Sequence, residues 1–237
     1  MNNTRRNLLL LLTPIMLLAL VACDTSVKTD KAEIGDPVAP TETVPAPEIY
    51  VIDTVNSSVT WIGSKITGRH NGVFKISQGE LHMHNNQLTG GTINFDMRGT
   101  RASDRNIDES SNARLTMHLR SPDFFDVARY PAASFVLTGV APYDSTRHKV
   151  TTPDSELRIK GATHYLTGNL TIKDKTRSVR FPAKITLHHN KLKAQANFNI
   201  DRTAWGLVYR SDEALGNQTI YPEVNIGIDL VAKHATP

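Results

Sequence analysis

Hydrophobic and polar residues alternate along most of the chain after residue 49. Between 194 and 200, for example, alanine, phenylalanine or isoleucine occupies every second position, and glutamine or asparagine fills the positions between. This period of two is typical of antiparallel strands that bury one face and expose the other. The same period occurs at 81–84, 93–98, 165–173, 183–188, 193–201 and 223–230. The pattern therefore predicts an all-β domain.

Turn-forming pairs separate neighbouring segments, at Asn85-Asn86, Asp174-Lys175 and His189-Asn190. Such pairs between alternating runs indicate β-hairpins. With roughly eight or more strands and little helix to cover two faces, closure into a barrel would remove the unpaired edges. A sandwich of two sheets is the alternative. The stretch 49–237 has a suitable length for one such domain.

Helix is expected in one region only, at 112–120 and in a short helix beginning at Ser121. Ser121 followed by Pro122 is a helix-start signature, and Tyr130-Pro131 returns the chain to extended geometry. Four aromatic residues gather here, namely Phe124, Phe125, Tyr130 and Phe135. We predict that this stretch closes one end of the sheet structure. The alternative is that these rings are simply core.

The first 22 residues have the composition of an export signal. Arg5 and Arg6 precede an apolar run at 8–20 that is short for a membrane span, and the run leads to Cys23. This arrangement resembles the bacterial lipoprotein signal, whose cysteine is acylated and becomes the mature N-terminus. An uncleaved anchor or an ordinary secretory signal are the alternatives. We expect acyl chains such as palmitate on Cys23, and a lipid-anchored protein in the bacterial cell envelope, facing the periplasm.

Residues 23–48 are predicted to be the acylated cysteine and a disordered linker. The segment contains four prolines and six acidic residues against two lysines, and it shows no apolar periodicity. A flexible chain of this length would reach roughly 25–30 Å from its anchor.

Charge and cysteine content narrow the classes of function. From residue 49 onward, 23 basic residues face 17 acidic ones, a modest excess that suits an anionic surface or headgroup. No compact basic run with interleaved aromatics is present, so nucleic-acid binding is poorly supported. Cys23 is the only cysteine, so an internal disulfide and a cysteine-based metal cluster are excluded.

The domain resembles the YceI family of exported, lipocalin-like proteins over about 49–232. The residues that carry the resemblance are Gly72-Val73-Phe74, Gly79-Glu80-Leu81, His118-Leu119, 121–127, Tyr130-Pro131-Ala132, Phe135, 168–173 and 198–203. The resemblance implies a lipocalin-like antiparallel barrel with a short helix near one end. It also implies an elongated apolar cavity for a polyisoprenoid chain, such as a quinone tail. The family usually has Asp where Ala204 stands, which removes a carboxylate near Arg202.

The alternation indicates which residues would line such a cavity. Apolar positions expected to contact the ligand are Leu81, Met83, Ile93, Phe95, Leu170, Ile185, Ala196, Phe198 and Ile200. Small residues such as Gly168, Ala194 and Ala196 would leave room for a ligand, or would accommodate a large side chain in a filled barrel. For a polar headgroup, the first candidate partner is Arg202, which lies beside Trp205, and the second is His70. Alternatively, Arg202 pairs with Asp201 or Asp212.

The sequence contains little that would support a catalytic function. His82 and His84 share one strand face, which is a metal-capable geometry, but a convergent third ligand is missing. Motifs of nucleophilic hydrolases, zinc proteases and phosphate loops do not occur. We therefore predict a binding protein, not an enzyme, with no cofactor other than a bound polyisoprenoid or quinone. A non-binding structural or stress-related envelope protein with a filled barrel is the alternative, and a metal-dependent enzyme is a weaker one.

Overall fold

The computed structural model describes residues 25–40, 47–146, 155 and 157–235. The strands are β1 (Glu33–Gly35), β2 (Glu48–Ile52), β3 (Ser58–Lys65), β4 (Gly68–His84), β5 (Gln87–Ala102), β6 (Ala132–Pro142), β7 (His164–Ile172), β8 (Lys175–His188), β9 (Lys191–Asp201) and β10 (Ile220–His234). The helices are α1 (Glu109–Arg120) and the short 3₁₀ turns η1 (Arg202–Trp205) and η2 (Glu213–Gln218). The proposed signal and Cys23 lie outside the described residues. No helix in the described part of the chain is long and apolar enough to cross a membrane.

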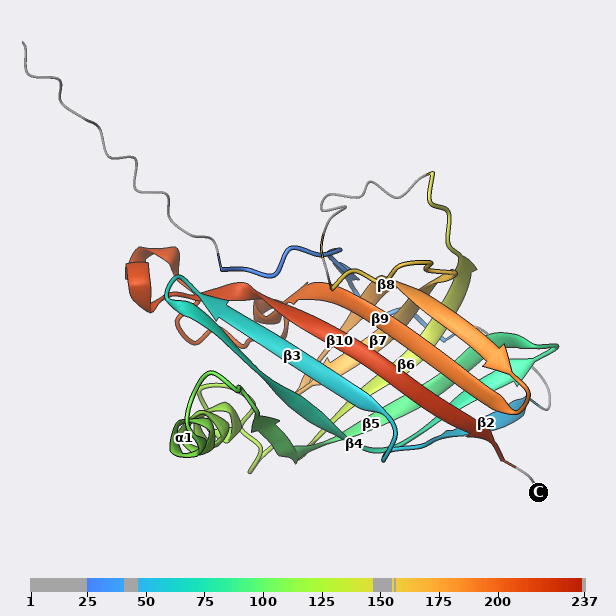
Figure 1. Ribbon diagram of the computed structural model, residues 1–237, viewed down its shortest axis with the longest axis horizontal. Coiled ribbons are helices and arrows are strands. Elements are labelled where there is room, and N and C mark those ends of the chain that lie inside the picture. Colours follow the sequence, from blue (N-terminus) through green and yellow to red (C-terminus); the bar gives the residue numbers. More distant parts are fainter. Residues whose placement is uncertain (1–24, 41–46, 147–154, 156, 236–237) are drawn as a thin grey trace, which may run out of the picture.

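Eight strands close into an antiparallel barrel (Figure 1). Each strand from β3 to β9 pairs with the next one along the chain, and β10 pairs with both β9 and β3. Strand β2 extends the line of β3, pairing with the end of β10 and with β4. The predicted antiparallel barrel with a short helix is thus confirmed, and the sandwich alternative is wrong.

The barrel wall has a gap that the N-terminal segment fills. Strands β8 and β9 pair only between Ala183 and His188 on the β8 side, and they diverge beyond Ala183. Residues 25–40, here called the strap, enter this space. Strand β1 pairs with β8, while Ala32 N–H donates to the Asn199 carbonyl at 2.9 Å. Val27 is buried as well. The expectation of a disordered linker is therefore wrong for 25–40.

The helix lies before the Ser-Pro pair and not after it. Helix α1 covers the predicted 112–120 and begins at Glu109, after the N-cap Asp108, whose carboxylate accepts a hydrogen bond from Ser111 N–H at 2.8 Å. Ser121 ends the helix in extended geometry, with φ −75° and ψ 170°, and turns follow it. The predicted helix beginning at Ser121 is wrong, since residues 122–125 form turns; the extended geometry that Pro122 favours at Ser121 suits the end of a helix as well as an N-cap. The same Ser-Pro pair can therefore begin or end a helix.

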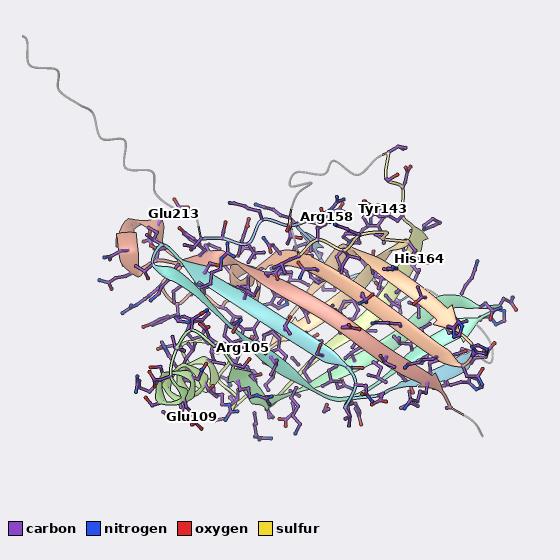
Figure 2. The ribbon with its side chains drawn as sticks, in the orientation of Figure 1. Arg105, Glu109, Tyr143, Arg158, His164 and Glu213 are labelled. Atoms are coloured by element: carbon purple, nitrogen blue, oxygen red, sulfur yellow. The ribbon has the colours of Figure 1, made fainter. Side chains whose placement is uncertain are left out.

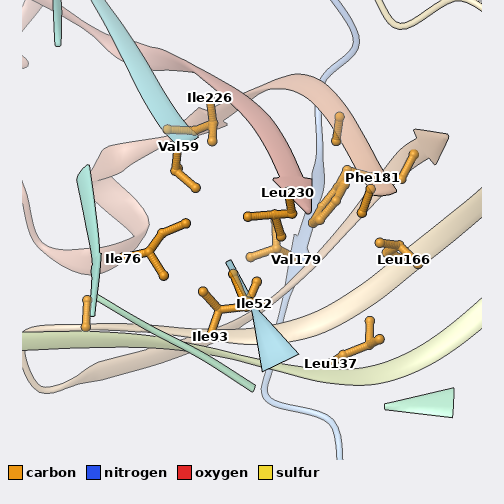
Figure 3. Packing of buried hydrophobic residues seen from close by; sticks show 14 of the residues in the cluster. Ile52, Val59, Ile76, Ile93, Leu137, Leu166, Val179, Phe181, Ile226 and Leu230 are labelled. Atoms are coloured by element: carbon orange, nitrogen blue, oxygen red, sulfur yellow. The ribbon is translucent and has the colours of Figure 1, made fainter. Parts of the chain in front are cut away.

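The inward-facing apolar residues form one continuous core. Figure 3 shows part of it, including Val59 from β3, Ile93 from β5 and Leu230 from β10. Phe181 and Phe198 stack across β8 and β9 with their ring centroids 4.1 Å apart, at the point where these two strands begin to diverge. Alternation along each strand thus gives the barrel an apolar interior, as period-two patterning requires.

Candidate ligand cavity

An elongated cavity runs through the barrel interior. Its volume is about 380 Å³, within the range of small-molecule sites. Along β10 alone it is lined by Ile220 and by alternate residues from Val224 to Leu230, which together span roughly 30 Å of strand. Most of the lining is aliphatic or aromatic, so the barrel is not filled by its own side chains.

Most of the predicted site residues line this cavity. They are Leu81, Ile93, Phe95, Leu170, Ala196, Phe198, Ile200, Arg202 and His70. Met83, Ile185 and Trp205 do not. Met83 is 2 % exposed and packs where β2 joins β4, and Ile185 is half-buried near the end of β8. Trp205 is buried in η1, and its Nε1–H donates to the Leu170 carbonyl at 2.9 Å.

The small inward residues divide into two groups. A side chain at Gly168 would place its Cβ 2.2 Å from the ring of Phe135, so this glycine makes room for an aromatic neighbour. Ala183, Ala194 and Ala196 instead line the cavity, and Ala183 pairs with Ala196 across β8 and β9. The alanines therefore give the cavity its width, while the glycine serves packing.

The aromatic stretch after α1 lines one end of the cavity. Phe124 and Phe125 are both buried and line it. The ring of Phe125 meets that of Phe74 edge-on, with centroids 5.7 Å apart, and Phe124 lies 5.3 Å from Tyr209. These rings are therefore part of the core and also part of the cavity wall. The two sequence-based interpretations, closure of one end and simple core packing, are compatible.

Polar side chains gather at this same end. His70 Nδ1 lies 2.9 Å from the carboxylate of Asp104, which is buried. The Asn106 backbone N–H and His70 hold the pKa of Asp104 below its ordinary value. His118 Nε2 lies 2.8 Å from the Asp123 carboxylate, and its ring meets Tyr209 edge-on at 4.9 Å.

Sequence reasoning missed His118, Tyr209, Lys65 and Arg210, which also line the cavity. Tyr209 and Arg210 lie in a loop without periodicity, and Lys65 lies at the end of β3. Two signals were available for His118: it belongs to the stretches that carry the family resemblance, and it lies near the end of a predicted helix, which must cover some part of the barrel.

Arg202 acts mainly as a structural clamp. Its guanidinium donates to the backbone carbonyls of Leu207, Tyr209, Ile220 and Tyr221. These four bonds use most of its five N–H groups, and burial lowers its pKa. The sequence suggested either a headgroup contact for Arg202 or an ion pair with Asp201 or Asp212. Neither interpretation holds in full, because backbone carbonyls accept from most of its N–H groups. The cause is the loop at 206–219, which folds back over η1.

The histidines form no metal centre in the part of the chain that the structure describes. No three His, Cys, Asp or Glu side chains come together there as a metal-binding group. His82 Nε2 instead lies 2.9 Å from the carboxylate of Glu80 on the outer face of β4.

Comparison with known proteins finds the same barrel fold in solved structures. BcnA from Burkholderia cenocepacia superposes with a TM-score of 0.58 at 21 % identity, over 77 % of this chain and 99 % of that protein. A polyisoprenoid-binding domain from Saccharophagus degradans superposes with a TM-score of 0.53 at 12 % identity, over 80 % and 100 %. At these identities the likeness shows a shared fold. No curated protein matches the chain. The sequence pattern of the YceI-like domain matches residues 50–232, and this protein therefore belongs to the YceI-like domain family.

Proposed function

We propose that this protein is a membrane-tethered binding protein that holds a long apolar lipid of the polyisoprenoid class in its barrel. The observation that carries the proposal is the apolar cavity of about 380 Å³ that extends along the strands. Its length suits a chain better than a compact ligand. The Saccharophagus degradans neighbour is described as a polyisoprenoid-binding domain, which supports the same ligand class.

Burial of apolar surface supplies the driving force. Each 100 Å² of ligand surface moved from water into this lining contributes about 2.5 kcal/mol, before the cost of immobilising a flexible chain is subtracted. The Phe181–Phe198 stack and Ala196 form the section of wall past which such a chain would lie.

The headgroup would lie at the end lined by His70, His118 and Tyr209. His70 uses Nδ1 for Asp104, which leaves Nε2 for a ligand. The phenol of Tyr209 and the ring of His118 add polar atoms beside it. We assign headgroup recognition to this set, with Arg202 in a supporting role, because four backbone carbonyls already occupy the guanidinium.

The tether would be an acylated Cys23, which places the barrel in the cell envelope, facing the periplasm. The apolar run at 8–20 that leads to this cysteine supports it. A strap that packs on the barrel leaves a short tether instead of a long spacer.

Analysis of the bound lipid tests the proposal. The full chain, purified in mild detergent, should release one apolar lipid per barrel on organic extraction, and native mass spectrometry should show the same added mass. A barrel that is empty after purification, and that takes up no polyprenyl lipid when one is supplied, would favour a structural envelope protein instead.

A further inference from the structure

Three apolar side chains are exposed at the end of the barrel where η2 and the turn between β3 and β4 lie. Ile66 is 43 % exposed, Val208 59 % and Leu215 43 %. We call these three residues, with the basic residues Lys65, Arg69 and Arg210, the mouth rim. Exposed aliphatic side chains are common singly, so their grouping at one place is the informative feature.

The rim surrounds the polar end of the cavity. Lys65 and Arg210 line the cavity directly, and Tyr209 lies between Val208 and Arg210. Ile220 pairs with Lys65, which brings the loop that carries Val208 and η2 next to the β3–β4 turn. Figure 1 shows η2, this turn and α1 at the same end of the barrel, and Figure 2 places Glu213 of η2 there.

The chain outside the described structure joins it at this rim. Thr25 donates its hydroxyl hydrogen to the Lys65 carbonyl, and Arg69 donates to the carbonyls of Thr25 and Ser26. The apolar run at 8–20 and Cys23 precede this point directly. Whatever membrane attachment these residues provide, the rim is the part of the barrel held nearest to it.

Charge permits the approach of a bilayer. The rim carries three basic residues, and the loop that carries Val208 and Leu215 adds Asp212 and Glu213, so the balance is slightly positive. This balance attracts anionic headgroups weakly, and most of the contact would come from insertion of the three aliphatic side chains.

We propose that the mouth rim is a docking surface for a lipid bilayer, which seats the polar end of the cavity against the membrane. Ile66, Val208 and Leu215 enter the headgroup region, and Lys65, Arg69 and Arg210 lie at headgroup level. A lipid chain then moves between bilayer and cavity without exposure to water. This inference goes beyond the binding function, since a rim can dock whether or not the cavity is loaded.

Tryptophan scanning with brominated lipids tests the docking surface. Ile66→Trp, Val208→Trp and Leu215→Trp each add a fluorophore to the full chain bound to vesicles of phosphatidylethanolamine and phosphatidylglycerol with brominated acyl chains. The native Trp61 and Trp205 are buried and give a constant background. Val55→Trp is the matched control, since Val55 is 90 % exposed in the turn before β3, and the eight residues of β3, about 25 Å of strand, separate this turn from Ile66.

The rim tryptophans should lose emission and shift to shorter wavelength, whereas Val55→Trp should behave like free protein. Adding Val208→Glu and Leu215→Glu to Ile66→Trp should restore its emission, and adding Val55→Glu should not. Equal quenching at all sites, no quenching at any site, or failure of the chain to float with the vesicles would overturn the proposal. If the emission of the rim tryptophans changed with protein concentration and not with bromination of the lipid, the rim would bind a second copy of this chain. That result would also overturn the proposal.

Discussion

The backbone N–H of Asn199 on β9 donates to the carbonyl of Asp30 in the strap at 2.8 Å. This bond joins the barrel to a segment that precedes the family domain. The Asn199 side chain also donates to the Val27 carbonyl at 2.6 Å. Strand β9 thus forms hydrogen bonds with the strap where it no longer pairs with β8. The barrel wall beside the cavity is therefore complete only when the strap is in place.

Asp30 offers a direct test of the strap. Its buried carboxylate accepts from Arg158 Nε at 3.2 Å, and Arg158 is labelled in Figure 2. Asp30→Asn should lower the free energy of unfolding by about 1–3 kcal/mol, because the charged hydrogen bond is lost at a buried site. Asp36→Asn is the control, since its ion pair with Arg177 involves a carboxylate that is 92 % exposed. Equal melting temperatures for the two variants would mean that the strap is loosely held.

Arg202→Ala should destabilise the whole fold. The substitution leaves the carbonyls of Leu207, Tyr209, Ile220 and Tyr221 without their donor, and we expect a loss of about 3–5 kcal/mol. Urea denaturation measures this loss, with the exposed Arg210→Ala as a control that should unfold near the wild-type midpoint. A wild-type midpoint for Arg202→Ala would refute the clamp.

Asp104 should contribute to stability in a pH-dependent way. Hydrogen bonds from Asn106 and His70 lower its pKa in the folded state. A depressed folded pKa stabilises the protein above the unfolded value of about 4, and this stabilisation disappears as pH falls further. Asp104→Asn should therefore lower the melting temperature at pH 6, and the difference from wild type should shrink below about pH 4. A constant difference across this range would contradict the assignment.

The barrel was predictable because alternation is a local signal that every strand repeats. The strap was not, because its hydrogen bonds to Asn199 and β8 join residues far apart in sequence, and a proline-containing acidic segment has no period of its own. The Ser121-Pro122 pair was misinterpreted for a related reason. The extended geometry imposed by Pro122 fits either end of a helix, and Asp108 already supplies the N-cap.

Of the site, the apolar lining was predictable and its polar end was not. Ala196, Phe198 and Ile200 face inward as their alternation requires. Which carbonyls accept hydrogen bonds from Arg202 depends on how the loop at 206–219 folds back, and no pattern in that loop indicates its path. Met83 and Trp205 are buried as expected of their types, but burial alone does not distinguish the cavity wall from the core behind it.

Cys23→Ser tests the tether. The variant should lack acyl chains and should either accumulate as precursor or be released from the membrane, as mass spectrometry and fractionation would show. The wild-type chain run in parallel should carry the mass of its acyl groups. Mature, processed variant in the membrane fraction would contradict the anchor.

The most direct test of the central claim fills the cavity from within. Ala196 lines the cavity between Ala183 and Ile228, so the ring of Ala196→Trp would occupy the volume of the lipid chain. Ala141→Trp on β6 is the matched control, because Ala141 is exposed and does not line the cavity. Bound lipid is quantified by organic extraction and native mass spectrometry of variants that remain folded. The account predicts that Ala141→Trp retains the wild-type lipid and that Ala196→Trp retains none; the same lipid at the same stoichiometry in Ala196→Trp would contradict it.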